Sequence, residues 1–287
     1  MERESLAAGR ALLHRPVLPL VAIVQFLYMT GDFATVEAVI AELPAEIETG
    51  YCRYDDAAAD LAPYSDLLRP LEALKAGQPP QESVVDGEGN AVDAMTAVVA
   101  LVAQRVLTRE LERINSLLCG PCGCTLCCVG PEASMAQCYF EIPLQAGEDR
   151  FFPLARIDSP ASRGHRVDDE PPLQVGGQDF FAHPHPVLIH WQQGWSLIMP
   201  RLSRCPNLQD SGRCLVYPDR PEVCRRPQIF AYVVEPVPAE GAGKPVFRLR
   251  QTLLAVVDCP YVQLLQDEIA AYAAACELEM IFRHNKA

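Results

Sequence analysis

Five of the ten residues in the segment CGPCGCTLCC, from Cys119 to Cys128, are cysteine. The chain of 287 residues contains 12 cysteines, so this density is a local feature. Cysteine-dense secreted domains are usually short and held by disulfides, whereas clustered cysteines in a long cytosolic chain more often bind metal. The segment therefore predicts that this part of the chain folds around a group of thiols.

A second cysteine block, CPNLQDSGRCLVYPDRPEVCRR, begins about 77 residues after the first block ends. It contributes three more thiols, from Cys205, Cys214 and Cys224. In the first block, Cys119/Cys122 and Cys124/Cys127 have the C-x-x-C spacing that lets two thiolates converge on one ion. Sulfur ligands select zinc or iron–sulfur clusters over magnesium or calcium, so one of these two is the expected metal.

The neighbouring residues Cys127 and Cys128 favour more than one metal atom. Adjacent side chains point in different directions in a strand or a helix, so they rarely share one tetrahedral ion. A polynuclear cluster or two separate sites uses such a pair more naturally, although the usual ferredoxin spacing is absent. The predicted ligand set is Cys119, Cys122, Cys124, Cys127, Cys128, Cys205, Cys214, Cys224 and Cys259, with ordinary packing left open for Cys259.

Cysteine and proline divide the chain near residue 118, which predicts a helical region over 1–118 and a cysteine-cluster metal-binding domain over 119–287. The pattern predicts an α+β fold. Helices are expected over 2–14, 17–29, 33–43, 54–75, 93–118 and 260–284, and strands over 138–144, 150–157, 228–237 and 246–257. The segment 187–199 predicts a hairpin that turns at Gln193 and Gly194.

The formal net charge of −13 argues against nucleic acid and against an anionic membrane surface as partners. The most apolar run, from Val17 to Met29, is too short for a membrane span and predicts a buried core helix. A signal peptide is the alternative, but Glu2 and Glu4 occupy the positions where a signal peptide carries basic residues. We therefore expect a cytoplasmic protein; the sequence predicts no particular oligomeric state.

The later block resembles the YkgJ-type cysteine-cluster family, which is described as a zinc- or iron-chelating domain. The matching positions are Cys205, Pro206, Leu208, Cys214, Val216, Tyr217, Arg220, Pro221, Cys224 and Arg225. The early block departs from the family pattern, since Cys124 is extra. The resemblance covers about 119–230 and implies a metal site. One relative, the flagellin lysine N-methylase, resembles this pattern and combines an iron–sulfur cluster with S-adenosylmethionine chemistry.

Three functions are therefore open. The first is a protein that binds an iron–sulfur cluster, of the four-iron type, and exchanges electrons with a redox partner protein or supports cluster-dependent chemistry. The second is a zinc-stabilised binding module without catalysis, and the third is a cluster-assisted methyltransferase. Arg220 and Arg225 are expected to offset the negative charge of the thiolates or to bind an anionic group.

Overall fold

The computed structural model describes residues 3–226, 228–237 and 244–284, which divide into two compact units. The first unit contains 3–118 and 228–284, and the second contains 119–226. The sequence predicts 119–287 as one region, whereas the structure groups its last third with the N-terminal part. Two contacts explain this grouping: Asn115 exchanges hydrogen bonds with the backbone of Ile229, and a strand at 246–256 pairs with one at 83–85.

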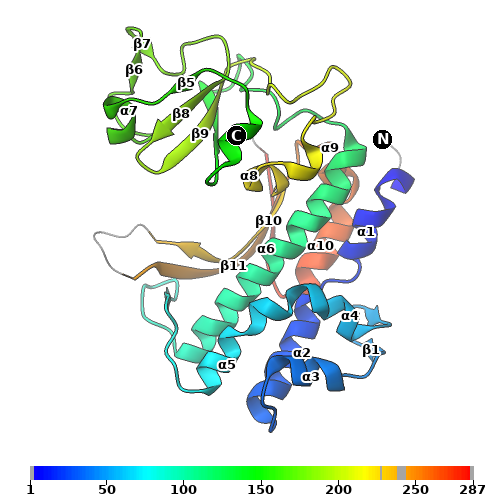
Figure 1. Cartoon of the computed structure of the whole chain (residues 1–287). Coiled ribbons are helices and arrows are strands. Elements are labelled where there is room, and N and C mark those ends of the chain that lie inside the picture. Colours follow the sequence, from blue (N-terminus) through cyan, green and yellow to red (C-terminus); the bar gives the residue numbers. More distant parts are fainter. Residues whose placement is uncertain (1–2, 227, 238–243, 285–287) are drawn as a thin grey trace. The chain divides into compact units, whose positions relative to one another are not determined.

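The N-terminal part of the first unit is helical, as predicted. Its elements are η1 (Arg3–Leu6), α1 (Ala7–Leu13), α2 (Leu18–Thr30), α3 (Val36–Glu42), α4 (Ala57–Leu61), η2 (Ala62–Leu68), α5 (Pro70–Lys75) and α6 (Ala94–Cys122), with a small β1–β2 pair at Ile47–Glu48 and Arg53–Tyr54. Leu20, Val21 and Val24 of α2 are fully buried, so the run from Val17 to Met29 contributes to the core. Figure 1 shows α2, α3, α4 and α5 gathered beside one stretch of α6.

The long helix α6 confirms the predicted apolar face, because Val98, Val102 and Val106 are buried. The helix does not end at Leu118 as predicted but continues to Cys122. Pro121 is tolerated because it lies in the last turn, and Gly123 ends the helix with a φ of 62°.

The first unit also contains a four-stranded sheet. β11 (Val246–Val256) pairs antiparallel with β10 (Ile229–Pro236) and parallel with both β12 (Glu279–Arg283) and β3 (Ser83–Val85). The pairing of β10 with β11 shifts register between Tyr232 and Val234. At this β-bulge, Gln104 of α6 accepts hydrogen bonds from the backbone N–H groups of Val233 and Val234 and donates one to the carbonyl of Ala231.

The C-terminal segment differs from its prediction as one helix over 260–284. It forms α9 (Pro260–Leu264), α10 (Gln266–Ala275) and then strand β12. The alanine-rich stretch is helical and α10 lies beside α1 (Figure 1). The helix ends because Glu277 adopts a φ of 56° and the N–H of Leu278 donates to the carbonyl of Ala273. The remaining residues complete the sheet next to β11, a long-range pairing that outweighs their helix propensity.

The second unit has its own four-stranded sheet, in the order β4 (Tyr139–Pro143), β9 (Gly194–Pro200), β8 (Val187–Trp191) and β5 (Arg156–Ile157). The predicted hairpin is confirmed as β8 and β9, with Trp191 paired to Gly194, so the turn lies one residue earlier than expected. The strand expected over 150–157 is only partly correct. Its first two residues belong to η3 (Glu148–Phe151), and only its last two residues form a strand, β5.

Short elements complete the second unit: α7 (Pro160–Gly164), β6 (Gln174–Val175), β7 (Gln178–Asp179), η4 (Tyr217–Asp219) and α8 (Glu222–Arg225). Two apolar clusters stabilise its sheet, one around Phe180 and Trp191 and one around Phe152, Leu188 and Leu197. With helices and several small sheets along one chain, the prediction of an α+β fold is confirmed.

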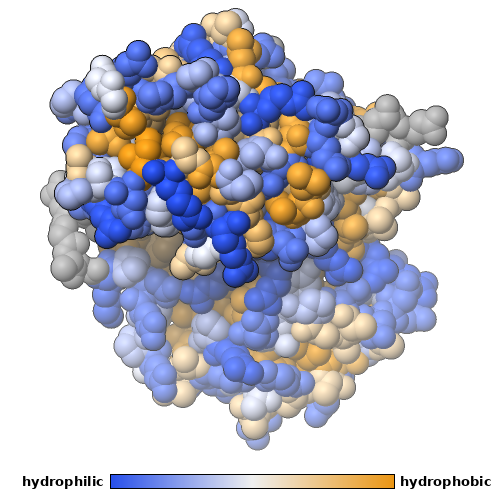
Figure 2. Space-filling model, turned by 45° about the horizontal axis from the view of Figure 1, so that its top comes forward, coloured by the Kyte–Doolittle hydropathy of each residue, from blue (hydrophilic) through white to orange (hydrophobic). Residues whose placement is uncertain are grey.

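Hydrophilic residues cover much of the face that Figure 2 displays, with hydrophobic residues gathered in small groups between them. The helical stretch Arg3–Thr30 is long and apolar enough to cross a membrane by length and composition alone. Part of this stretch is buried in the core of the first unit. Location in the cell stays a prediction.

Candidate metal centre

The first cysteine block begins inside a helix. Cys119 and Cys122 lie on the last turn of α6, and the positive φ of Gly123 then turns the chain sharply. A second turn follows directly, in which the N–H of Cys128 donates to the carbonyl of Thr125 at 2.8 Å. Cys119 and Cys122 therefore lie on a helical turn, Cys127 and Cys128 lie on a tight turn, and Cys124 lies in the connection between the two turns.

Backbone hydrogen bonds join the two cysteine blocks. The N–H of Cys205 donates to the carbonyl of Cys128 at 2.9 Å, and the N–H of Gly130 donates to the carbonyl of Ser203 at 2.8 Å. A Cβ atom at Gly130 would lie 1.9 Å from the carbonyl oxygen of Pro200, so this close approach requires glycine. Segments about 77 residues apart in sequence are thus held side by side.

The second block folds back on itself before it reaches its last cysteine. Leu208 and Cys214 form an antiparallel bridge that closes a tight loop, at whose tip Gly212 has a φ of 79°. Cys224 lies on the short helix α8. The loop and the helix supply thiols from two further directions.

These turns bring seven cysteines to the wall of one cavity with a volume of about 300 Å³. They are Cys119, Cys124, Cys127, Cys128, Cys205, Cys214 and Cys224. Cys122 does not line the cavity, but its Sγ atom lies within 4.8 Å of that of Cys124. None of the cysteines in the part of the chain that the structure describes forms a disulfide. This cysteine cluster can hold a metal.

Cys127 is electrostatically central to the cluster. The thiol of Cys128 hydrogen bonds to its sulfur, which lowers the pKa of Cys127 and raises that of Cys128. Burial raises the pKa of Cys119 to about 11 and that of Cys224 to about 12, and repulsion by negative charge on Cys127 is the next largest cause for both. Burial likewise raises the pKa of Cys205. Crowded thiols of this kind favour the deprotonated form once a cation compensates their charge.

Two arginines line the cavity, Arg213 and Arg220, and of these Arg220 is the buried one. Its side chain is only 7% exposed, and its guanidinium lies over the ring of Tyr217 at 3.8 Å. Its charge opposes the rise in the pKa of both Cys119 and Cys224. Arg220 therefore stabilises thiolates in this cavity.

The other predicted arginine, Arg225, does not line the cavity. Its Nε atom is buried and has no hydrogen-bond partner among the residues that the structure describes. The next residue, Arg226, forms an ion pair with Glu222 one helical turn away, as a solvated side chain does.

The remaining four cysteines do not line this cavity. Cys259 belongs to the first unit, where it is fully buried at the N-terminus of α9, and its ligation stays a prediction. Cys138 is exposed and lies 3.8 Å from Nη2 of Arg201. Cys52 and Cys276 lie in the first unit, and burial raises the pKa of Cys276 well above its ordinary value.

Several residues of the cavity wall are absent from the predicted site, among them Ile142, Phe152 and Asn207. Ile142 and Phe152 form apolar parts of its wall, and Asn207 donates through Nδ2 to the carbonyl of Phe151 at 3.0 Å. No spacing signal identifies Ile142 or Phe152, because both come from the sheet region between the two blocks. Asn207 lies inside the second block, two residues after Cys205, so its position in the sequence could have identified it as a residue of the site.

Searches of protein-family models, curated proteins and solved structures find no match to this chain. The resemblance to the YkgJ-type family is carried by the motif residues alone and stays a prediction.

Proposed function

We propose that the cysteine cavity holds an iron–sulfur cluster of the four-iron type and that the protein serves redox or cluster-dependent chemistry. The observation that carries this proposal is the gathering of seven cysteines around one cavity of about 300 Å³. Four thiolates hold a cluster of this type. A zinc ion bonds directly to its four sulfurs at about 2.3 Å, so a mononuclear zinc site needs no comparable space between them.

The surroundings of the thiols support the same proposal. Potentials of iron–sulfur clusters depend on nearby charge, hydrogen bonds and solvent exposure. Here Arg220 supplies a buried positive charge, while Ile142, Phe152 and Val216 supply an apolar wall. In this proposal a redox partner protein exchanges electrons with the cluster.

Zinc is the second candidate, and the paired spacing of the thiols favours it. Cys122 lies outside the cavity wall, but its sulfur lies close to that of Cys124. Thiols inside and outside the cavity fit two separate four-thiolate sites. The second unit would then be a binding module whose loops fold with zinc. Methyl transfer, which the resemblance implies, stays a prediction with no observation in its favour.

Purification without oxygen, followed by metal and sulfide analysis, tests the proposal. We expect a brown protein with broad visible absorption and with iron and acid-labile sulfide in equal amounts. Replacing Cys127 or Cys214 by serine should remove most of the bound metal, because each sulfur lines the cavity.

Cys52→Ser is the matched control, since Cys52 lies in the first unit and should leave the metal content unchanged. A colourless protein with stoichiometric zinc would support the binding module instead. Absence of both iron and zinc, or an unchanged iron content in Cys127→Ser, would contradict the proposal.

A further inference from the structure

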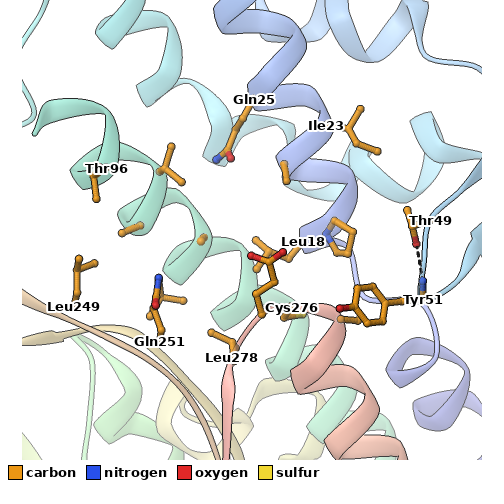
Figure 3. Close-up of a pocket in the computed structure, with 18 of the residues that line it drawn as sticks. Leu18, Ile23, Gln25, Thr49, Tyr51, Thr96, Leu249, Gln251, Cys276 and Leu278 are labelled. Carbon is orange, nitrogen blue, oxygen red and sulfur yellow. Dashed lines mark hydrogen bonds between the residues drawn. The ribbon is translucent and has the colours of Figure 1, made fainter.

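A second cavity, with a volume of about 630 Å³, lies within the first unit. Its walls come from α2, the β1–β2 turn, α6, strands β10 and β11, and the end of α10 (Figure 3). Most of the lining side chains are apolar, including Leu18, Ile23, Val99, Leu249 and Leu278. Cavities of this size and character are typical of small-molecule sites.

One polar group in this cavity has no partner. The Nε2 atom of Gln25 on α2 is buried and makes no hydrogen bond with any described residue. In Figure 3 the Gln25 side chain extends from α2 into the space beside α6. A buried donor without an acceptor costs about 1–3 kcal/mol, which an acceptor atom of a bound molecule would recover.

The charge of the lining indicates which molecules fit. Among the described residues, Glu277 is the one charged side chain that lines the cavity, and no lysine, arginine or histidine does so. A carboxylate or phosphate would therefore lose its hydration without gaining a positive partner. The cavity fits a neutral molecule with an apolar body.

The cavity wall also contains backbone held in an unusual conformation. Gln251 and Glu277 have φ values of 52° and 56°, and only one other described non-glycine residue, Leu202, has a positive φ. Gln251 lies at the β-bulge whose backbone hydrogen bonds to the side chain of Gln104 on α6. Such conformations cost about 1–3 kcal/mol and concentrate at binding sites.

We propose that this cavity binds a neutral, largely apolar small molecule that presents a carbonyl or ether oxygen to Nε2 of Gln25. The site lies wholly within the first unit and goes beyond the proposed function, on which it does not depend. The apolar body lies against Leu18, Val99 and Leu249, and the oxygen accepts the hydrogen bond that Gln25 otherwise lacks.

The test compares two probes with the same phenylethyl body, 4-phenylbutan-2-one and 3-phenylpropanoate, by ligand-observed NMR titration of the full chain. We expect the ketone to bind and the anion to bind at least about tenfold more weakly, since no cation compensates its charge. Equal binding of the two probes, or no binding of the ketone, would overturn the proposal.

Gln25→Leu separates a ligand-binding role from a structural one. Loss of the donor should weaken ketone binding by about fivefold to tenfold, in line with one hydrogen bond. It should also raise the thermal midpoint of the ligand-free chain, because the unsatisfied buried group is gone. A lower midpoint together with unchanged ketone binding would show that Gln25 is structural and that the assignment is wrong.

Val99→Trp fills the cavity from α6 and should abolish ketone binding. Ala94→Trp places the same side chain at an exposed position of α6 that does not line the cavity, so binding should persist. Circular dichroism confirms that both variants fold. Persistent ketone binding in a folded Val99→Trp variant would locate the probe elsewhere and refute the site.

Discussion

At the scale of single residues, Glu110 of α6 is a buried carboxyl group with a strongly raised pKa. It is 3% exposed and accepts hydrogen bonds from the N–H of Val17 at 2.9 Å and the hydroxyl of Tyr272 at 2.7 Å. Burial raises its pKa from 4.5 to about 7, against the opposing effects of these two donors and of Arg113, while Asp60 adds to the rise. Folding therefore favours the protonated form of this side chain.

The raised pKa of Glu110 predicts a stability that falls as pH increases. Between pH 4.5 and about 7 the folded chain keeps a proton that the unfolded chain releases, so the free energy of unfolding decreases across this window and levels off above it. Glu110→Gln should flatten the decrease, because its amide can still accept from Val17 and donate to the oxygen of Tyr272. We expect the variant to be more stable at pH 8 by about 1–3 kcal/mol.

Urea unfolding at pH 5 and pH 8 measures this effect. Glu42→Gln, at an exposed position of α3, is the control and should keep the wild-type pH dependence. The same slope in Glu110→Gln would contradict the role assigned to burial.

At the scale of elements, the close passage of one cysteine block past the other depends on Gly130. A methyl group at this position would meet the backbone carbonyl of Pro200 and force the two segments apart. Gly130→Ala should therefore lower the metal content of the purified protein by more than half although it removes no ligand. Gly164→Ala, in the same unit, places its methyl group in open space and should bind metal normally. Full metal content in Gly130→Ala would show that the backbone bridge is dispensable.

Local patterns explain which elements the sequence predicts well. The β8–β9 hairpin and the buried face of α6 follow from alternation and helical periodicity, which neighbouring residues already express. β12 was mistaken for the end of a helix, because its pairing with β11 depends on residues far away in the chain. The same reason separates 228–284 from the region to which the sequence assigned it.

The candidate site likewise contains some residues that the sequence pattern predicts and others that it does not. The sequence predicts nine cysteine ligands, and seven of them line one cavity, whereas Cys122 and Cys259 do not. Turn residues such as Gly123 and Gly212 lie beside the thiols that the cavity gathers. Spacing does not identify Phe152, which reaches the cavity wall from the sheet region. It also does not identify the cavity around Gln25, which needs helices and strands from both ends of the chain.

At the scale of the whole molecule, the two units differ in what holds them together. The first unit has a large apolar core that includes Leu20, Val24, Leu61, Leu68 and Leu71. The second has two small apolar clusters around its sheet, and its cysteine segments 119–130 and 203–226 contain short helices, turns and isolated bridges. Segments of this kind bury little apolar surface, so we expect their order to depend on a bound metal.

Metal removal should therefore loosen one part of the molecule selectively. After treatment with a chelator under reducing, oxygen-free conditions, hydrogen exchange followed by mass spectrometry should show faster exchange in 119–130 and 203–226. The hairpin of β8 and β9 should stay protected, because Leu188, Ile189, Leu197 and Ile198 are fully buried in the apolar clusters of its sheet. The helices of the first unit should stay protected for the same reason. Uniform loss of protection along the chain would show that both units fold only with the metal. Unchanged exchange in the two cysteine segments would show that hydrogen bonds such as that from Cys205 to Cys128 suffice to order them.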